Sequence, residues 1–129
     1  MATRRAARER ALALCYELET KRETADDVLA ELPVPPDEYT VTLVRGVDEH
    51  RDELDGLLGT VSERWAVERM PAVDRALLRI GSYELGWVPD TPVGVVIDEA
   101  VELAQQYSTA DSGRFVHALL ARIADQVRS

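Results

Sequence analysis

The stretch VDRALLRIGSYEL, residues 73–85, decides how the chain is built. Its apolar residues recur at intervals of three and four, the spacing that places side chains on one side of an α-helix. We expect one broad side to be buried, formed by Val73, Ala76, Leu77, Ile80 and Leu85. The stretch also carries four charges, on Asp74, Arg75, Arg79 and Glu84. The sequence therefore predicts a packing helix, whose charges serve either catalysis or an edge that meets a partner.

Helical periodicity continues on both sides of this stretch. Further helices are predicted at about 4–19, from Thr24 to before Pro33, from about 36 to 61, at 92–107, and from 111 or 112 onward. The run VGVVI at 93–97 is β-branched and also fits a strand, but helical spacing continues to Tyr107 and favours a helix. The pattern predicts a single all-α domain with two helical groups, about 1–61 and 62–129.

The longest predicted helix begins near Pro36 and Asp37, and its apolar stripe reaches Val61. Gly46 and Gly56 lie within it, and each glycine weakens a helix by roughly 1 kcal/mol relative to alanine. A bend is therefore expected. We predict that this helix packs against the second group and joins both groups into one unit.

The charge of the chain is divided unevenly. The net charge is −9, which argues against binding of nucleic acid by the chain as a whole, because phosphate contacts require cations. Residues 1–10 nevertheless carry +3, since four arginines oppose Glu9 alone, and the remainder carries −12. This basic end on an acidic body predicts an anion site at one place and a basic protein at another.

The chemistry expected of an enzyme is missing from the sequence. There is neither a glycine-rich phosphate loop nor a nucleophile elbow. His50 lies in the acidic run DEHRDELD (48–55) without a second histidine nearby, so a solvated face is favoured over a metal site. Cys15 lies on an apolar helix face and is expected in the core. We therefore expect no catalysis, metal or cofactor.

The expected location follows from the same composition. A lone cysteine fits a reducing compartment, and no segment is apolar enough over sufficient length to form a signal peptide or cross a membrane. These features predict a cytoplasmic protein.

Four segments together resemble the NusB family. They are RRAARERALALCYELE (4–19), WAVERMPAVDRALLRIGSYEL (65–85), TPVGVVIDEAVELAQQY (91–107) and DSGRFVHALLARI (111–123). The resemblance implies an all-α bundle of about seven helices in two packed subdomains. It also implies transcription antitermination, chiefly of ribosomal RNA operons, by binding boxA in nascent RNA together with NusE, a small-subunit ribosomal protein. Other Nus factors and RNA polymerase would join the complex, and no cofactor or catalysis would be involved.

The resemblance also implies a set of residues that bind RNA. The positions that match it are Arg4, Arg5, Arg8, Tyr16, Asp74, Asp111, Arg114 and Phe115. Arginines would neutralise phosphates, aromatic rings would stack on bases, and Asp74 would accept a hydrogen bond from a base or a 2′-hydroxyl. Tyr16 and Phe115 equally fit buried aromatics, Asp111 also fits a helix cap, and Asp74 fits a first-turn acid. With about four phosphate contacts, the logarithm of affinity would fall with the logarithm of salt at a slope of roughly −2.8.

The acidic body predicts the surface for NusE. We expect that protein near the exposed edge of 73–85 and the helix at 92–107, and the candidate contacts are Glu84, Asp98, Glu99 and Glu102. One departure from the family pattern is His117–Ala118, where Asn-Gly is usual, so local helix packing is expected to differ. Two other interpretations stay open. One is a protein-only adaptor or homodimer that covers the arginine surface, and the other is a NusB-like module related to RNA methyltransferases.

Overall fold

The computed structural model describes residues 3–128. Over this range the regular secondary structure consists of helices joined by loops, without strands. The helices are α1 (Arg4–Lys21), α2 (Ala25–Ala30), α3 (Glu38–Glu49), α4 (Arg51–Val61), α5 (Ala72–Trp87), α6 (Val93–Tyr107) and α7 (Ser112–Val127), with a 3₁₀ turn at Val67–Arg69. The prediction of an all-α fold with about seven helices is confirmed. The run at 93–97 is the first turn of α6, so the strand alternative is excluded.

Local sequence signals account for several helix starts. Thr24, where the second helix is predicted to start, forms a reciprocal capping box with Asp27 at α2. Asp37 caps α3 by accepting a hydrogen bond from the Tyr39 amide. Pro92 occupies the N-cap position of α6, so this helix begins one residue later than the predicted 92–107.

The predicted long helix from 36 to 61 is wrong, because the structure divides it into α3 and α4 at His50. His50 has φ −104° and ψ 19°, and its ring lies 4.4 Å from that of Trp87 between centroids. The break therefore coincides with a contact to α5 and with neither glycine. Gly46 has a different function, since a Cβ there would overlap the ring of Tyr83 where α3 and α5 approach closely.

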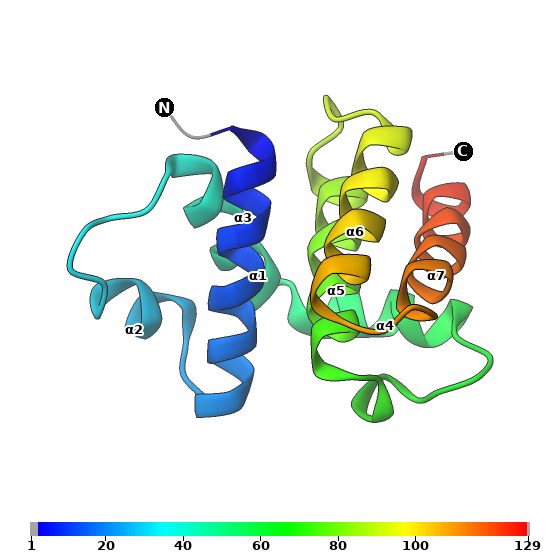
Figure 1. The fold of residues 1–129 in the computed structure, drawn as a ribbon, viewed down its shortest axis with the longest axis horizontal. Helices are drawn as coiled ribbons and strands as arrows, with labels where there is room; N and C mark the ends of the chain where they lie inside the picture. Colours follow the sequence, from blue (N-terminus) through cyan, green and yellow to red (C-terminus); the bar gives the residue numbers. More distant parts are fainter. Residues whose placement is uncertain (1–2, 129) are drawn as a thin grey trace.

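The helices form two sides of one bundle (Figure 1). Helices α1, α2 and α3 pack together on one side, and α5, α6 and α7 on the other. Helix α4 contacts α5 and α7 more extensively than α3, so its contacts place it with the second group. The division into subdomains at about residue 61 stays a prediction.

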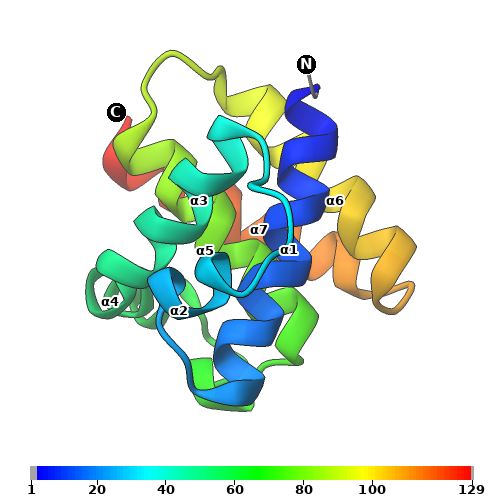
Figure 2. The same cartoon turned by 90° about the vertical axis from the view of Figure 1, so that its left-hand side faces the viewer.

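Helix α5 is the centre of the bundle, and Figure 2 shows it behind α1 and α3. It contacts α1, α3, α4, α6 and α7, so every side of it faces another helix. Its buried residues are Asp74 through Ser82 together with Glu84 and Leu85. The predicted polar edge on 73–85 is therefore wrong, because the charged side chains of this helix lie inside the molecule.

The end of α5 is bound by a side chain that lies far along the sequence. Arg128 donates hydrogen bonds to the carbonyl oxygens of Glu84, Leu85, Val88 and Thr91. Carbonyls at a helix end have no partner within the helix, and a cation also suits the negative end of the helix dipole. Arg128 thus completes the last turn of α5 and the loop that follows it.

Candidate nucleic-acid interface

Two predicted site residues pair with each other inside the molecule. Arg8 on α1 binds Glu84 on α5 through two hydrogen bonds of 2.7 and 2.9 Å, and the residues are 4% and 1% exposed. Burial disfavours the charge of Arg8, but the hydrogen bond and attraction from Glu84 outweigh it and raise the pKa of the guanidinium. The expectation that Arg8 faces RNA and Glu84 faces a protein partner is corrected here, because this pair joins two helices and neither side chain is accessible.

Asp74 is also enclosed, at 1% exposure. Its two carboxylate oxygens accept hydrogen bonds from the hydroxyls of Ser108, at 2.7 Å, and Ser112, at 2.9 Å. The predicted contact of this carboxylate with RNA is corrected, because both oxygens already bind the α6–α7 connection. Asp74 instead fixes the start of α7 beside the first turn of α5.

The two arginines of α5 bind acids on other helices. Arg79 forms a bidentate ion pair with Asp55 of α4, with hydrogen bonds of 2.8 and 2.9 Å. Arg75 pairs with Glu19 of α1 and donates to the Met70 carbonyl oxygen at 2.7 Å. The charges of this helix therefore form no exposed edge. They connect α5 to the elements that surround it.

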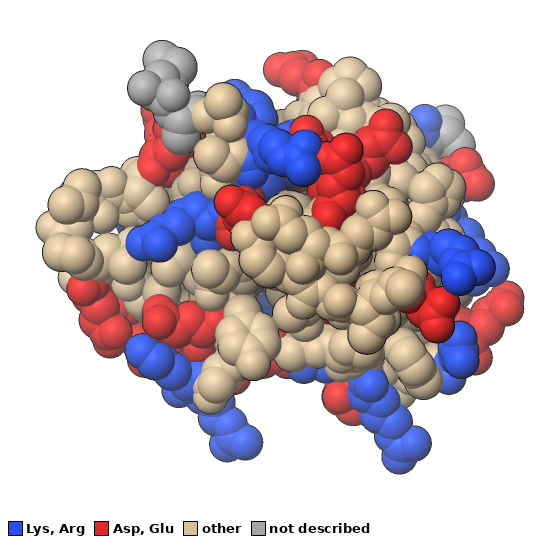
Figure 3. Space-filling view, in the orientation of Figure 1, with Lys and Arg blue, Asp and Glu red and all other residues tan. Residues whose placement is uncertain are grey.

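The remaining arginines of α1 lie at the surface. Arg4 lies over the ring of Tyr39, with 3.7 Å between Cζ and the ring centroid. Arg5 is about half exposed and pairs with Glu99 and Glu102 of α6. Figure 3 shows this contact as basic side chains directly beside acidic ones near the start of α1. Two residues predicted for NusE thus pair with a residue predicted for RNA.

Arg10 is a candidate that the sequence analysis missed. It is exposed, and no carboxylate within residues 3–128 forms an ion pair with it. Arg8 and Arg10 both flank the apolar stripe of α1, so no local signal distinguishes them. The partner of the buried arginine, Glu84, lies 76 positions after Arg8.

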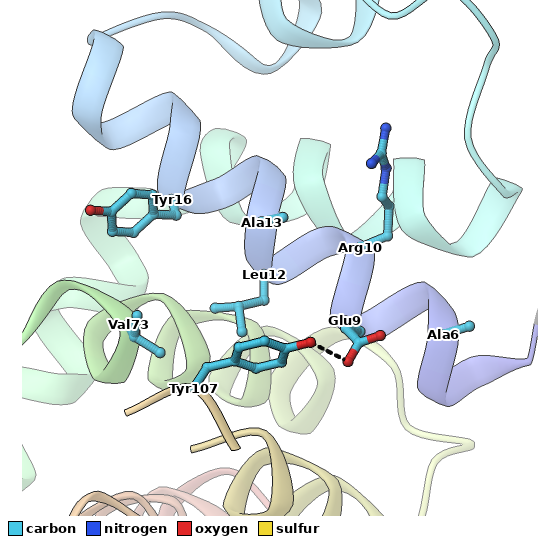
Figure 4. A pocket seen from close by; sticks show the side chains of 8 residues that line it. All are labelled: Ala6, Glu9, Arg10, Leu12, Ala13, Tyr16, Val73 and Tyr107. Carbon is cyan, nitrogen blue, oxygen red and sulfur yellow. Dashed lines mark hydrogen bonds between the residues drawn. The ribbon is translucent and has the colours of Figure 1, made fainter. Parts of the chain in front are cut away.

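A groove of about 590 Å³ runs along α1 where it meets α5 and α6 (Figure 4). Its lining consists of Ala6, Glu9, Arg10, Leu12, Ala13, Tyr16, Val73 and Tyr107. Tyr16 and Tyr107 are 44% and 47% exposed, and Leu12 lies between them. The Tyr107 hydroxyl donates to Glu9 at 2.6 Å, which raises the pKa of this tyrosine. Arg10 extends away from the groove, so the walls are largely apolar.

The start of α7 carries the other predicted contacts. Asp111 and Arg114 pair at 3.1 Å and are both largely exposed. Asp111 occupies the N-cap position of α7, but its side chain forms no capping hydrogen bond. Phe115 is half-buried and packs edge-on against Trp65, with 5.2 Å between centroids. These three positions stay predicted RNA contacts, and Asp98, which is exposed on α6, stays a predicted partner contact.

Two classes of site have no counterpart among the described residues. In residues 3–128, histidine, cysteine and acidic side chains form no cluster of three or more suited to a metal ion. None of the helices in this range combines the length and apolar character needed to traverse a bilayer. Cys15 is buried in the core, as predicted.

The chain resembles known proteins along nearly its whole length. Residues 5–125 match the model of the NusB family. Transcription antitermination protein NusB from Kineococcus radiotolerans is 48% identical, over 97% of this chain and 95% of that protein. The structure of NusB from T. maritima is 33% identical and superimposes with a TM-score of 0.89, over 97% of this chain and 92% of that one.

A further solved structure contains antitermination factors NusB and NusE in complex with dsRNA. The matching chain is 25% identical, with a TM-score of 0.82, and the match covers 95% of this chain and 96% of that chain. The helical architecture, the family model and the near full-length identity agree. The chain described here belongs to the NusB family.

Proposed function

We propose that this protein is a transcription antitermination factor that binds RNA together with NusE. The observation that carries the proposal is the near full-length identity to proteins of that name, 48% for the relative from Kineococcus radiotolerans. A homologous structure with NusE and dsRNA supports both partners. Such a factor would act in the cytoplasm and would join other Nus factors and RNA polymerase when the complex assembles.

The start of α1 is the proposed RNA surface. Arg4, Arg5 and Arg10 are exposed there, whereas Arg8 is bound internally. Guanidinium groups bind phosphates through paired hydrogen bonds, which suits them to the backbone of an RNA strand. Three phosphate contacts at the start of α1 would contribute about −2.1 to the salt slope for a single strand, or roughly 20-fold in affinity between 50 and 200 mM.

The groove beside these arginines is proposed to receive NusE. Its walls are apolar, the Glu9 carboxylate lies within it, and Arg10 extends away, so RNA phosphates would find little attraction there. Half-exposed tyrosines beside aliphatic side chains are typical of the residues that dominate protein interfaces. Tyr16 is thereby reassigned from base stacking to contact with the protein partner.

The decisive experiment measures binding of a single-stranded boxA RNA to the protein with and without NusE, at 50 and 200 mM salt. We expect tighter binding with NusE and the slope given above. The same binding measurement with a duplex of this sequence shows whether the RNA must be single-stranded. Absence of RNA binding in the presence of NusE would remove the proposed function.

Variants separate the two surfaces. Tyr16→Ala should weaken NusE binding by at least about 30-fold, the loss expected for an interface hot spot, and leave direct RNA binding unchanged. Val34→Ala is the matched control, because Val34 is an exposed aliphatic residue outside the groove. A Tyr16→Ala protein that binds NusE as tightly as this control would refute the placement of NusE. A homodimer built on the groove would compete with NusE, which sedimentation with and without NusE detects.

A further inference from the structure

We propose that Glu99 and Glu102 act as an intramolecular competitor that RNA phosphates must displace from Arg5. This inference rests on the proposed function, since it concerns how the same arginine surface is regulated. It concerns acids that the sequence analysis assigned to NusE and that the structure places against a candidate RNA contact.

The geometry gives Arg5 two carboxylates on one side. Glu99 and Glu102 are three positions apart on α6, so their side chains project from the same face of that helix. Glu102 contacts the Arg5 guanidinium directly, and the nearer oxygen of Glu99 lies 3.8 Å from the same nitrogen. That Glu99 oxygen is buried and has no hydrogen-bond partner within residues 3–128. Its negative charge therefore has Arg5 as a nearby counter-charge.

The exposure of this contact makes it exchangeable. The side chains of Arg5 and Glu102 are 53% and 49% exposed, and water screens an ion pair at such a surface, so it holds its partners weakly. A phosphate offers the guanidinium stronger, paired hydrogen bonds. When a phosphate binds, however, two carboxylates remain beside it and repel it, which lowers the net gain.

The two acids affect some RNA strands more than others. A strand that also contacts Arg4 and Arg10 compensates for displacing the acids, whereas a strand that reaches Arg5 alone does not. The acidic pair therefore suppresses weak, unspecific binding of polyanions more than it suppresses binding of a correctly seated RNA. A surface with the same arginines and no neighbouring acids would bind polyanions more indiscriminately.

The test measures affinity for single-stranded boxA RNA without NusE at 50 mM salt. Glu102→Gln, and Glu99→Gln with Glu102→Gln, should raise affinity about two- to fivefold, the range set by an exposed ion pair. Asp90→Asn is the charge-matched control, because Asp90 is an exposed acid in the loop before α6 and forms no ion pair with Arg5. It should reproduce only the general effect of one fewer negative charge.

The same changes made in an Arg5→Gln variant test whether the effect of the acids depends on Arg5. When Arg5→Gln is already present, the glutamine changes on α6 should raise affinity no more than Asp90→Asn does. An equal gain with and without Arg5, or an equal gain from Asp90→Asn, would overturn the proposal. Circular dichroism and thermal melting confirm that each variant is folded, and Glu102→Gln alone avoids the partly buried position 99.

A readout without RNA keeps the two proposals apart. Elution from immobilised heparin reports the affinity of the same arginines for a generic polyanion. Glu102→Gln should elute at higher salt than the unchanged protein, and Arg5→Gln should abolish the difference. If the unchanged protein fails to bind boxA RNA with NusE, the proposed function fails, while the heparin series still decides whether the acids compete for Arg5.

Discussion

Two of the ion pairs that connect α1 to the second half of the chain differ in their access to water. Arg8 and Glu84 are enclosed, with side chains 5% and 1% exposed, and form two short hydrogen bonds. Arg5 and Glu102, less than one turn away along α1, are about half exposed. We call Arg5–Glu102 the outer pair and Arg8–Glu84 the inner pair. Water screens the outer pair and replaces it easily, whereas separation of the inner pair leaves a buried charge without solvent. The comparison shows that burial decides whether water or another anion can replace the partner of an arginine.

The largest effect is expected for the inner pair. Arg8→Met leaves the Glu84 carboxylate buried without its partner and should lower the free energy of unfolding by about 3–5 kcal/mol. Urea denaturation at an unchanged m-value measures the loss. Arg8→Met combined with Glu84→Leu should recover much of the stability, because no buried charge remains. If the free energy of unfolding of Arg8→Met fell by less than about 1 kcal/mol, the contact between α1 and α5 would not depend on this ion pair.

An intermediate effect is expected where a buried carboxylate binds hydroxyl groups instead of a cation. Asp74→Ala leaves the hydroxyls of Ser108 and Ser112 without their acceptor and should cost about 1–3 kcal/mol. Amide hydrogen exchange should also accelerate at the α6–α7 connection. The matched control is Asp111→Ala, an exposed acid in the same segment, with an expected change within about 0.5 kcal/mol. Equal losses in both variants would refute the assigned role of Asp74.

The outer pair should affect stability little and RNA binding measurably. Arg5→Gln is expected to change the free energy of unfolding by less than about 1 kcal/mol, because the pair is exposed. The same change should make the salt slope for single-stranded RNA shallower by about 0.7, the contribution of one phosphate contact. Urea denaturation and RNA titrations at several salt concentrations measure the two quantities. An unchanged slope would remove Arg5 from the RNA surface.

The smallest effect at neutral pH is expected for Cys15. Burial raises the pKa of its thiol from 9.0 to about 12, more than the nearby Arg51 and Arg79 lower it. The unfolded chain therefore releases this proton at lower pH than the folded one, so stability is unaffected below pH 9 and falls between about pH 9 and 12. Cys15→Ala should remove that component from a denaturation series in pH. Rapid alkylation of the folded protein at pH 8 would contradict the buried, neutral thiol.

The sequence was a reliable guide where the deciding interaction is local. The capping box of Thr24 and Asp27 spans three residues, and the apolar spacing of 92–107 distinguishes a helix from a strand within one segment. The break at His50 does not follow from the local sequence, because it coincides with a contact to the ring of Trp87, 37 positions away, and the nearest glycine, Gly46, lies four positions before it. Local patterns therefore predicted the number and nature of the helices better than their junctions.

The candidate site was predictable only in part for the same reason. Arginines at the start of the chain were recognisable, but Arg8 and Arg10 have equivalent local surroundings and opposite exposure. The charges of 73–85 suggested an exposed edge, because the periodicity of one helix cannot reveal that neighbours cover every side of it. Glu84 and Asp74 are explained only by partners that lie 76 and more than 30 positions away.

The hydrogen bonds of Arg128 impose an order on how the protein matures during translation. The carbonyl groups that it binds lie 37 to 44 positions earlier, so the ribosome exposes the end of α5 well before it delivers the side chain that binds it. At about 5–20 residues per second, this interval lasts roughly 2–9 s. Until Arg128 has been added, these carbonyls lack the guanidinium that binds all four, so the end of α5 gains its final hydrogen bonds only after the last turn of α7 has been synthesised.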